Sequence, residues 1–152
     1  MATKGQQQKL KVLVVDDAEP ARLLIERSLA SANCEIAFAA DGLEAVEMHK
    51  TSGFDVVLLD IEMPVLDGYV AARCIRKHEM ENSQSPALIV AVTSKSSDRE
   101  REKAYISGCD MLLAKPFKRD VLIEILDTHR EKLVKGPSQA KAPAAGSSRQ
   151  TG

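Results

Sequence analysis

Four apolar segments of this chain each end where a polar or charged residue begins. They are LKVLVV at 10–15, FDVVLL at 54–59, ALIVAV at 87–92 and DMLLA at 110–114. Strands that are apolar along most of their length, and not only at alternate positions, are typical of a parallel sheet covered on both faces. This feature therefore favours an α/β fold over other classes.

The segments between these strands carry helical patterns. In ARLLIERSLAS, apolar residues recur at helical spacing and Pro20 suits a first helical turn. A weaker strand, CEIAFA, is predicted at 34–39, and the last helix is predicted from about 119 to 133. Five strands thus alternate with five helices. Right-handed crossovers make such a chain a doubly wound sheet, whose functional crevice lies beyond the carboxyl ends of the strands.

A length of 152 residues suits one domain. We expect a polar leader at 1–9, the folded domain at 10–133 and a disordered tail at 134–152. Residues 135–152 contain no apolar side chain bulkier than proline and cannot form a core. The chain lacks an apolar run long enough to span a membrane or to act as a signal peptide, which predicts a cytoplasmic protein without membrane contact.

The net charge, the cysteines and the histidines restrict the possible functions further. Residues 10–133 hold all 22 acids and 16 of the 21 Lys and Arg residues, a net charge of −6, which gives no support to nucleic-acid binding. The cysteines are predicted to be buried free thiols, because they are odd in number and have no CxxC spacing: Cys34, Cys74 and Cys109. The histidines are predicted to lie on polar helix surfaces: His49, His78 and His129.

Polar side chains follow four of the predicted strands. They are Asp16 and Asp17, then Asp60, then Thr93 and Ser94, and finally Lys115. Because the carboxyl ends of parallel strands meet at one edge, three carboxylates, a hydroxyl and an ammonium group should converge there. Carboxylates suit Mg²⁺, and a cation, a lysine and a hydroxyl donor together suit phosphoryl transfer, with one carboxylate as a nucleophile.

At these residues the sequence resembles the receiver domain of bacterial two-component response regulators, over residues 10 to about 131. The matching motifs are the acid pair in VLVVDD, the run VVLLDIEMPVLDG, the hydroxyl in AVTS, and KPF. The resemblance implies a flavodoxin-like fold with the strand order 2-1-3-4-5. Residue by residue, it implies that Asp60 accepts a phosphoryl group from a histidine of a sensor kinase or of a phosphotransfer protein.

The resemblance also implies a metal site and two phosphoryl contacts. Asp17, Asp60 and the backbone carbonyl of Glu62 would bind Mg²⁺ directly, with Mn²⁺ able to substitute, and Asp16 would act through metal-bound water. Thr93 and Lys115 would contact the phosphoryl oxygens. In the same comparison, Pro116 matches a cis-peptide position that aims the lysine, and Pro64 and Gly68 shape the loop after the phosphoacceptor.

Three positions depart from the usual receiver pattern. Ser94 replaces a common alanine, which we expect to be harmless. Leu112 stands where a switch aromatic is familiar, which puts that route of signal propagation in doubt, and Tyr105 is not at the matching position. Glu62 and Lys95 could form a charge pair that hinders the attacking water, although two separately solvated side chains remain an alternative.

Other functions compete with this interpretation. A flavodoxin is rejected because DDAEP would repel a phosphate and aromatic residues are scarce. A metal-dependent phosphatase would need a cap for which the chain is too short, and the intact acid, hydroxyl and lysine set argues against a receiver-shaped scaffold. We expect a phosphoacceptor that signals to a downstream protein or passes the group on. The initiating Met favours a separate protein over a piece of a hybrid kinase.

Overall fold

Residues 9–63 and 66–135 are described by the structure, a computed structural model, and within them five strands alternate with five helices. The elements are β1 (Leu10–Val15), α1 (Glu19–Ser28), β2 (Cys34–Ala39), α2 (Gly42–Ser52), β3 (Val56–Asp60), α3 (Gly68–Glu81), β4 (Leu88–Thr93), α4 (Asp98–Ile106), β5 (Met111–Ala114) and α5 (Arg119–Lys135). Predicted and observed elements correspond one to one and differ by a few residues at their ends. The predicted leader at 1–9 lies outside the described residues except for Lys9. The predicted tail at 134–152 begins too early, because α5 continues to Lys135, and its remainder from 136 lies outside the described residues.

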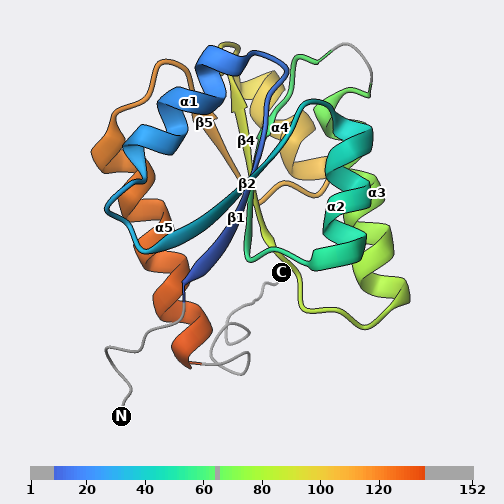
Figure 1. Cartoon of the computed structure of the whole chain (residues 1–152). Coiled ribbons are helices and arrows are strands. Elements are labelled where there is room, and N and C mark those ends of the chain that lie inside the picture. Colours follow the sequence, from blue (N-terminus) through green and yellow to red (C-terminus); the bar gives the residue numbers. More distant parts are fainter. Residues whose placement is uncertain (1–8, 64–65, 136–152) are drawn as a thin grey trace, which may run out of the picture. The chain divides into compact units, whose positions relative to one another are not determined.

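The five strands form one parallel sheet in the order β2-β1-β3-β4-β5 (Figure 1). This order confirms the flavodoxin-like topology that the resemblance implied. All five residues of β3 are buried, as are five of the six in β4, because the central strands are covered on both faces. The continuous apolar pattern that predicted a parallel sheet therefore reflects this double coverage.

The helices cover the sheet from two sides. Figure 1 shows α1 on one face and α2 and α3 on the other. On that second face, α4 joins α3, because Ala104 packs in the same apolar cluster as Ala71 and Ile75. The hydroxyl of Tyr69 at the start of α3 also donates to the Glu100 carboxylate of α4 at 2.8 Å. Helix α5 belongs to a second unit of the chain, which begins at Lys118.

Close packing requires a glycine at position 68. The sequence had instead suggested that Gly68 is needed because glycine can adopt backbone angles that other residues avoid. It is the first residue of α3 and is not among the residues with positive φ. A Cβ at this position would lie 2.8 Å from the carbonyl oxygen of Asp60 and 2.8 Å from Cα of Ile61. The glycine therefore lets the helix start against the end of β3. Pro64, expected to shape the same loop, lies outside the described residues.

The predicted surface position of His49 is wrong, because this side chain is only 1% exposed. The backbone N–H of Phe54 donates to its Nδ1 at 3.2 Å, which leaves Nε2 to donate to the carboxylate of Glu79 at 3.0 Å. Glu79 also accepts hydrogen bonds from Arg76 of α3 and from the backbone N–H of Ala87. A buried histidine is stable here because both ring nitrogens have partners.

The cysteines are free thiols as predicted, but only one of the three is buried. Cys109 is buried, Cys34 is half-buried and Cys74 is exposed on α3. Burial raises the pKa of the Cys109 thiol to about 12, so this side chain stays protonated at neutral pH.

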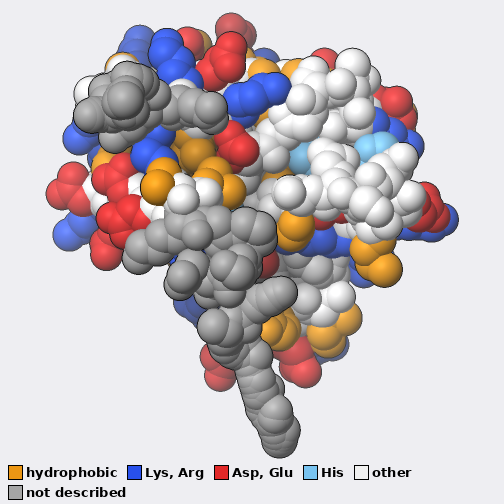
Figure 2. Space-filling view, turned by 90° about the horizontal axis from the view of Figure 1, so that it is seen from below, with side chains coloured by type: hydrophobic (Ala, Val, Ile, Leu, Met, Phe, Trp, Pro, Cys, Tyr) orange, Lys and Arg blue, Asp and Glu red, His pale blue; other side chains and the backbone are white. Residues whose placement is uncertain are grey.

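No helix in the described part of the chain is long and apolar enough to cross a membrane. On the face seen in Figure 2, acidic and basic side chains are interspersed among the described residues.

Candidate functional site

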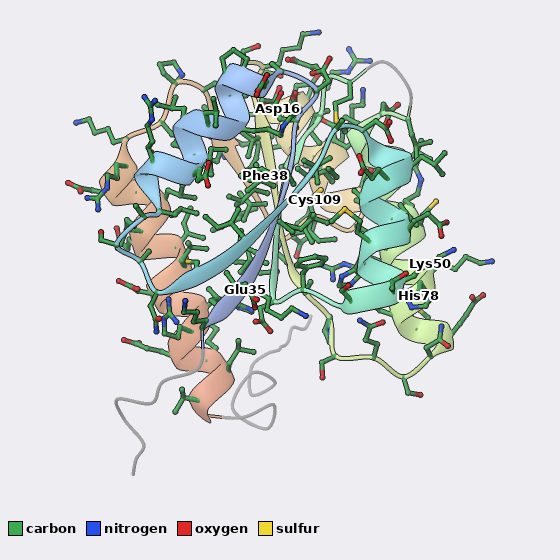
Figure 3. All side chains as sticks on the ribbon, in the orientation of Figure 1. Asp16, Glu35, Phe38, Lys50, His78 and Cys109 are labelled. Atoms are coloured by element: carbon green, nitrogen blue, oxygen red, sulfur yellow. The ribbon has the colours of Figure 1, made fainter. Side chains whose placement is uncertain are left out.

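The polar residues predicted to converge do lie at one edge of the sheet. Asp16 and Asp17 follow β1, Asp60 ends β3 and Thr93 ends β4. Lys115 follows β5 directly, and its peptide bond to Pro116 is cis, as the resemblance implied. Figure 3 shows Asp16 where β1 ends, at the end of the sheet opposite Glu35 near the start of β2.

The three aspartates form a tight cluster. Their carboxylate oxygens, one from each residue, lie within 4.8 Å of one another. Asp16 and Asp60 are each 4% exposed, whereas Asp17 is exposed. The Nζ atom of Lys115 lies 3.7 Å from Oδ2 of Asp16 and 3.7 Å from Oδ1 of Asp60. One ammonium group therefore lies near two of the three carboxylates.

The surroundings of Asp60 disfavour its ionised form. Burial, with added repulsion from Asp16 and Asp17, raises the pKa of Asp60 to about 6. The backbone N–H of Glu62, which donates to Oδ1 of Asp60 at 3.1 Å, and the charge of Lys115 oppose this rise without cancelling it. Burial of the carboxylate therefore outweighs the compensation that these two groups provide.

A hard divalent cation fits this donor set. Two or three carboxylate oxygens from Asp16, Asp17 and Asp60 are the ligands that Mg²⁺ prefers, and a cation would relieve the repulsion that adds to the effect of burial on the pKa of Asp60. This fit is inferred from the carboxylate type of the three donors and from the short distances between their oxygen atoms.

Asp16 is fixed by contacts that the sequence did not reveal. Its Oδ1 accepts a hydrogen bond from the backbone N–H of Ala18 at 2.9 Å. Its carbonyl oxygen accepts one from the guanidinium of Arg22 in α1 at 2.6 Å. Arg22 had no distinguishing signal in the sequence, because its role depends on how α1 folds back over the end of β1.

The hydroxyl of Thr93 lies at the same edge but is bound to another acid. Thr93 is 1% exposed, and its Oγ1 donates to Oε2 of Glu62 at 3.0 Å. The hydroxyl of Ser94 donates to the other oxygen of Glu62 at 3.4 Å. The hypothesised pair of Glu62 with Lys95 is therefore wrong, since the carboxylate turns toward the two hydroxyls and no such ion pair exists among the described residues.

A cavity of about 430 Å³ adjoins the acids. Asp16, Asp60 and Lys115 line it together with apolar side chains that include Leu24 and Ile25 of α1 and Phe117. Apolar side chains therefore line the part of the cavity that lies next to the acid cluster.

Leu112 lies on β5 as an ordinary apolar residue. It is half-buried and packs against the main apolar cluster of the sheet and α3. Tyr105 of α4 is 75% exposed, which agrees with its exclusion from the aromatic switch role.

Comparison with known proteins decides between the functions that this geometry allows. A family model described as the response regulator receiver domain matches residues 12–127. The chain belongs to the response regulator receiver family. This receiver is 39% identical over 113 residues to the hybrid signal transduction histidine kinase G of Dictyostelium discoideum. That match covers 73% of the chain and only 3% of the kinase.

Two solved receiver structures are similar to this one. The receiver domain of the sensor histidine kinase PA1611 from Pseudomonas aeruginosa, solved with a magnesium ion coordinated in its active-site cleft, shares 34% identity. Its TM-score is 0.73, and the match covers 82% of this chain and 99% of that one. The receiver domain of Saccharomyces cerevisiae Ssk1, co-crystallised with the histidine phosphotransfer protein Ypd1, shares 33% identity. Its TM-score is 0.71, and the match covers 76% of this chain and 84% of that one. This receiver is thus homologous to those of two-component and phosphorelay proteins.

Proposed function

We propose that Asp60 is the phosphoacceptor of this receiver and takes a phosphoryl group from a phosphohistidine. The observation that carries the proposal is the buried Asp60 carboxylate with a pKa raised to about 6, held between Asp16 and Lys115. At neutral pH most of this carboxylate is ionised, so it can act as a nucleophile.

The transfer forms one bond and breaks another. A carboxylate oxygen of Asp60 attacks the phosphorus, the bond from phosphorus to the histidine nitrogen breaks, and the electron pair leaves with the imidazole. Lys115, whose Nζ lies 3.7 Å from Asp60, would neutralise charge on the phosphoryl oxygens. Thr93 would donate its hydroxyl to one of those oxygens.

The residues that would hold a cation are Asp17 and Asp60, the backbone carbonyl of Glu62, and Asp16 through water. When bound, Mg²⁺, or Mn²⁺ in its place, would neutralise charge that develops on the transferred group. The domain itself would supply these groups both for transfer and for later hydrolysis, in which water attacks the phosphorus and releases phosphate from Asp60. No separate enzyme would be needed for either step.

The donor is proposed to be a sensor histidine kinase or a histidine phosphotransfer protein. The complex of the similar Ssk1 receiver with Ypd1 supports this class of partner. Phosphorylation replaces the single negative charge of the ionised Asp60 carboxylate with a phosphoryl group that carries close to two, which would shift the domain between two states and change its contacts with a downstream protein. We place this signalling in the cytoplasm and assign it neither a nucleic acid nor a membrane partner.

Intact mass tests the proposal. The wild type, Asp60→Asn and the matched control Asp98→Asn, which removes an exposed acid of α4, are incubated with acetyl phosphate with and without Mg²⁺. A gain of one phosphoryl group that needs Mg²⁺, persists in Asp98→Asn and is lost in Asp60→Asn is the expected result. If neither acetyl phosphate nor a phosphorylated histidine protein adds mass to the wild type, the receiver is a scaffold and the proposal is wrong.

A further inference from the structure

Glu62 holds the hydroxyl that the proposed chemistry needs. Although Glu62 is an exposed residue, its carboxylate reaches the buried Thr93, whose Oγ1 donates to it at 3.0 Å. The Ser94 hydroxyl donates to the second carboxylate oxygen at 3.4 Å. Both oxygens of one acid are therefore engaged by two consecutive residues at the end of β4.

The hydrogen bonds at Thr93 leave no proton for another acceptor. A threonine hydroxyl has a single proton to donate, and here that proton goes to Glu62. The same oxygen accepts a hydrogen bond from the backbone N–H of Lys95 at 3.0 Å, which fixes the hydroxyl from the other side. Thr93 therefore cannot donate to a phosphoryl oxygen while it donates to Glu62.

We propose that Glu62 is a positioning residue that competes with the phosphoryl group for the Thr93 hydroxyl. The proposal rests on the function proposed for Asp60 and adds a regulatory step to it. Phosphorylation of Asp60 would have to release Thr93 from Glu62, so Glu62 lowers the affinity of the site for a phosphoryl group. Removal of its side chain should strengthen the binding of a phosphoryl mimic.

The position of Glu62 makes it sensitive to the charge on Asp60. Its backbone N–H donates to Oδ1 of Asp60 at 3.1 Å, so the two residues are in direct contact. A phosphoryl group on Asp60 would replace the single charge of the ionised carboxylate with close to two negative charges, so the negative charge next to Glu62 would increase. Repulsion would then turn the Glu62 side chain away from Thr93 and Ser94, and both hydroxyls would lose their acceptor at once.

Binding of beryllofluoride, a phosphoryl mimic, tests this competition. Isothermal titration calorimetry at saturating Mg²⁺ compares the wild type with Asp60→Asn, Glu62→Ala, Glu62→Gln, Thr93→Ala and the double variant Glu62→Ala/Thr93→Ala. We expect Glu62→Ala to bind the mimic about five-fold more tightly, as for the removal of one competing hydrogen bond. Glu62→Gln should fall between the wild type and Glu62→Ala, because an amide oxygen still accepts from Thr93 but carries no charge.

The double variant separates competition for the hydroxyl from simple charge repulsion. If Glu62 acts through Thr93, Glu62→Ala should change affinity less than about two-fold in the Thr93→Ala background. An equal gain in both backgrounds, or no gain in either, would overturn the proposal while leaving the phosphoacceptor role of Asp60 intact. Glu26→Ala, which removes an exposed acid of α1, is the matched control and should leave the affinity unchanged.

A different set of binding results would show that the phosphoacceptor role proposed for Asp60 is itself wrong. If the wild type and all variants fail to bind beryllofluoride, the phosphoacceptor role of Asp60 is wrong and the competition falls with it. If binding is present but is unchanged in Asp60→Asn, the mimic does not act at Asp60, and both proposals are overturned.

Discussion

Two buried acids at opposite ends of the same sheet have opposite electrostatic surroundings. Glu79, in the last turn of α3, is 3% exposed and accepts hydrogen bonds from His49, from Arg76 and from the backbone N–H of Ala87 just before β4. Burial alone would raise the pKa of Glu79, but these three hydrogen bonds outweigh it and the pKa is lowered.

Asp60, at the carboxyl end of β3, is similarly buried, with 4% of its surface exposed. Fewer hydrogen bonds stabilise its negative charge than stabilise that of Glu79. One backbone N–H donates to it, the Lys115 ammonium lies 3.7 Å away, and Asp16 and Asp17 repel it. Its pKa is raised to about 6.

Burial of an acid therefore does not by itself identify a functional site. An acid whose partners are all supplied by the protein stabilises the fold, as Glu79 does between α2, α3 and the start of β4. An acid whose charge the protein leaves partly uncompensated costs stability and can be neutralised by a ligand. The comparison predicts opposite responses to mutation at the two positions.

The largest effect should come from the removal of the well-paired acid. Glu79→Ala would leave His49 Nε2 and the Ala87 N–H without their acceptor and would remove the carboxylate that pairs with Arg76 on α3, which should cost about 3–5 kcal/mol of unfolding free energy. Urea denaturation at pH 7 measures this loss. Glu81→Ala, an exposed position on the same helix, should change stability by less than about 0.5 kcal/mol. Equal effects of the two substitutions would contradict the structural role of Glu79.

A smaller effect of opposite sign is expected at Asp60. The folded-state pKa lies above the usual 3.8, so the folded protein binds this proton more tightly than the unfolded chain does. The resulting stabilisation is fully present below about pH 4 and is lost as the pH rises through about 6. Asp60→Asn should therefore raise the unfolding free energy at pH 7 by about 2 kcal/mol and leave it nearly unchanged at pH 4.

Unfolding curves of the wild type and Asp60→Asn at both pH values provide this measurement. Destabilisation by Asp60→Asn at pH 7 would show that the ionised Asp60 carboxylate is well compensated after all, and the contrast with Glu79 would disappear.

The smallest effect concerns the cation. Mg²⁺ at about ten times its dissociation constant should stabilise the wild type by about 1.4 kcal/mol, because it binds the folded acid cluster and not the unfolded chain. Thermal unfolding with and without Mg²⁺ measures the shift. Asp60→Asn should lose most of it, and Glu81→Ala should keep it. A shift of the same size in Asp60→Asn would place the cation elsewhere.

Most of the fold could be predicted from the sequence because the three central strands, β1, β3 and β4, are buried along nearly their whole length. LKVLVV was predicted with the same bounds as β1, because a short apolar run that stops at two acids is typical of a buried strand. The strand order required the resemblance to receivers, because alternation of strands and helices fits more than one order. The meeting of Asp16, Asp60 and Lys115 followed from parallel strands alone.

Side-chain partners distant in sequence could not be predicted. His49 lies on a helix of weak apolar pattern, and its burial depends on Glu79, which is 30 positions away. Glu62 was expected to face Lys95 because both flank the site, but two hydroxyls lie closer to its carboxylate. These choices depend on distances of a few ångströms between elements, and residue type does not encode them locally.

Titration of the individual carboxyl groups by carbon-detected NMR tests the central contrast most directly. We expect Asp60 to titrate near pH 6 without Mg²⁺ and at a lower pH when Mg²⁺ is added, because a bound cation favours the ionised form. Glu79 should titrate below the usual value for glutamate, with or without Mg²⁺. If Asp60 titrates near pH 4 and does not respond to Mg²⁺, its charge is already compensated by the protein, and the central claim is wrong.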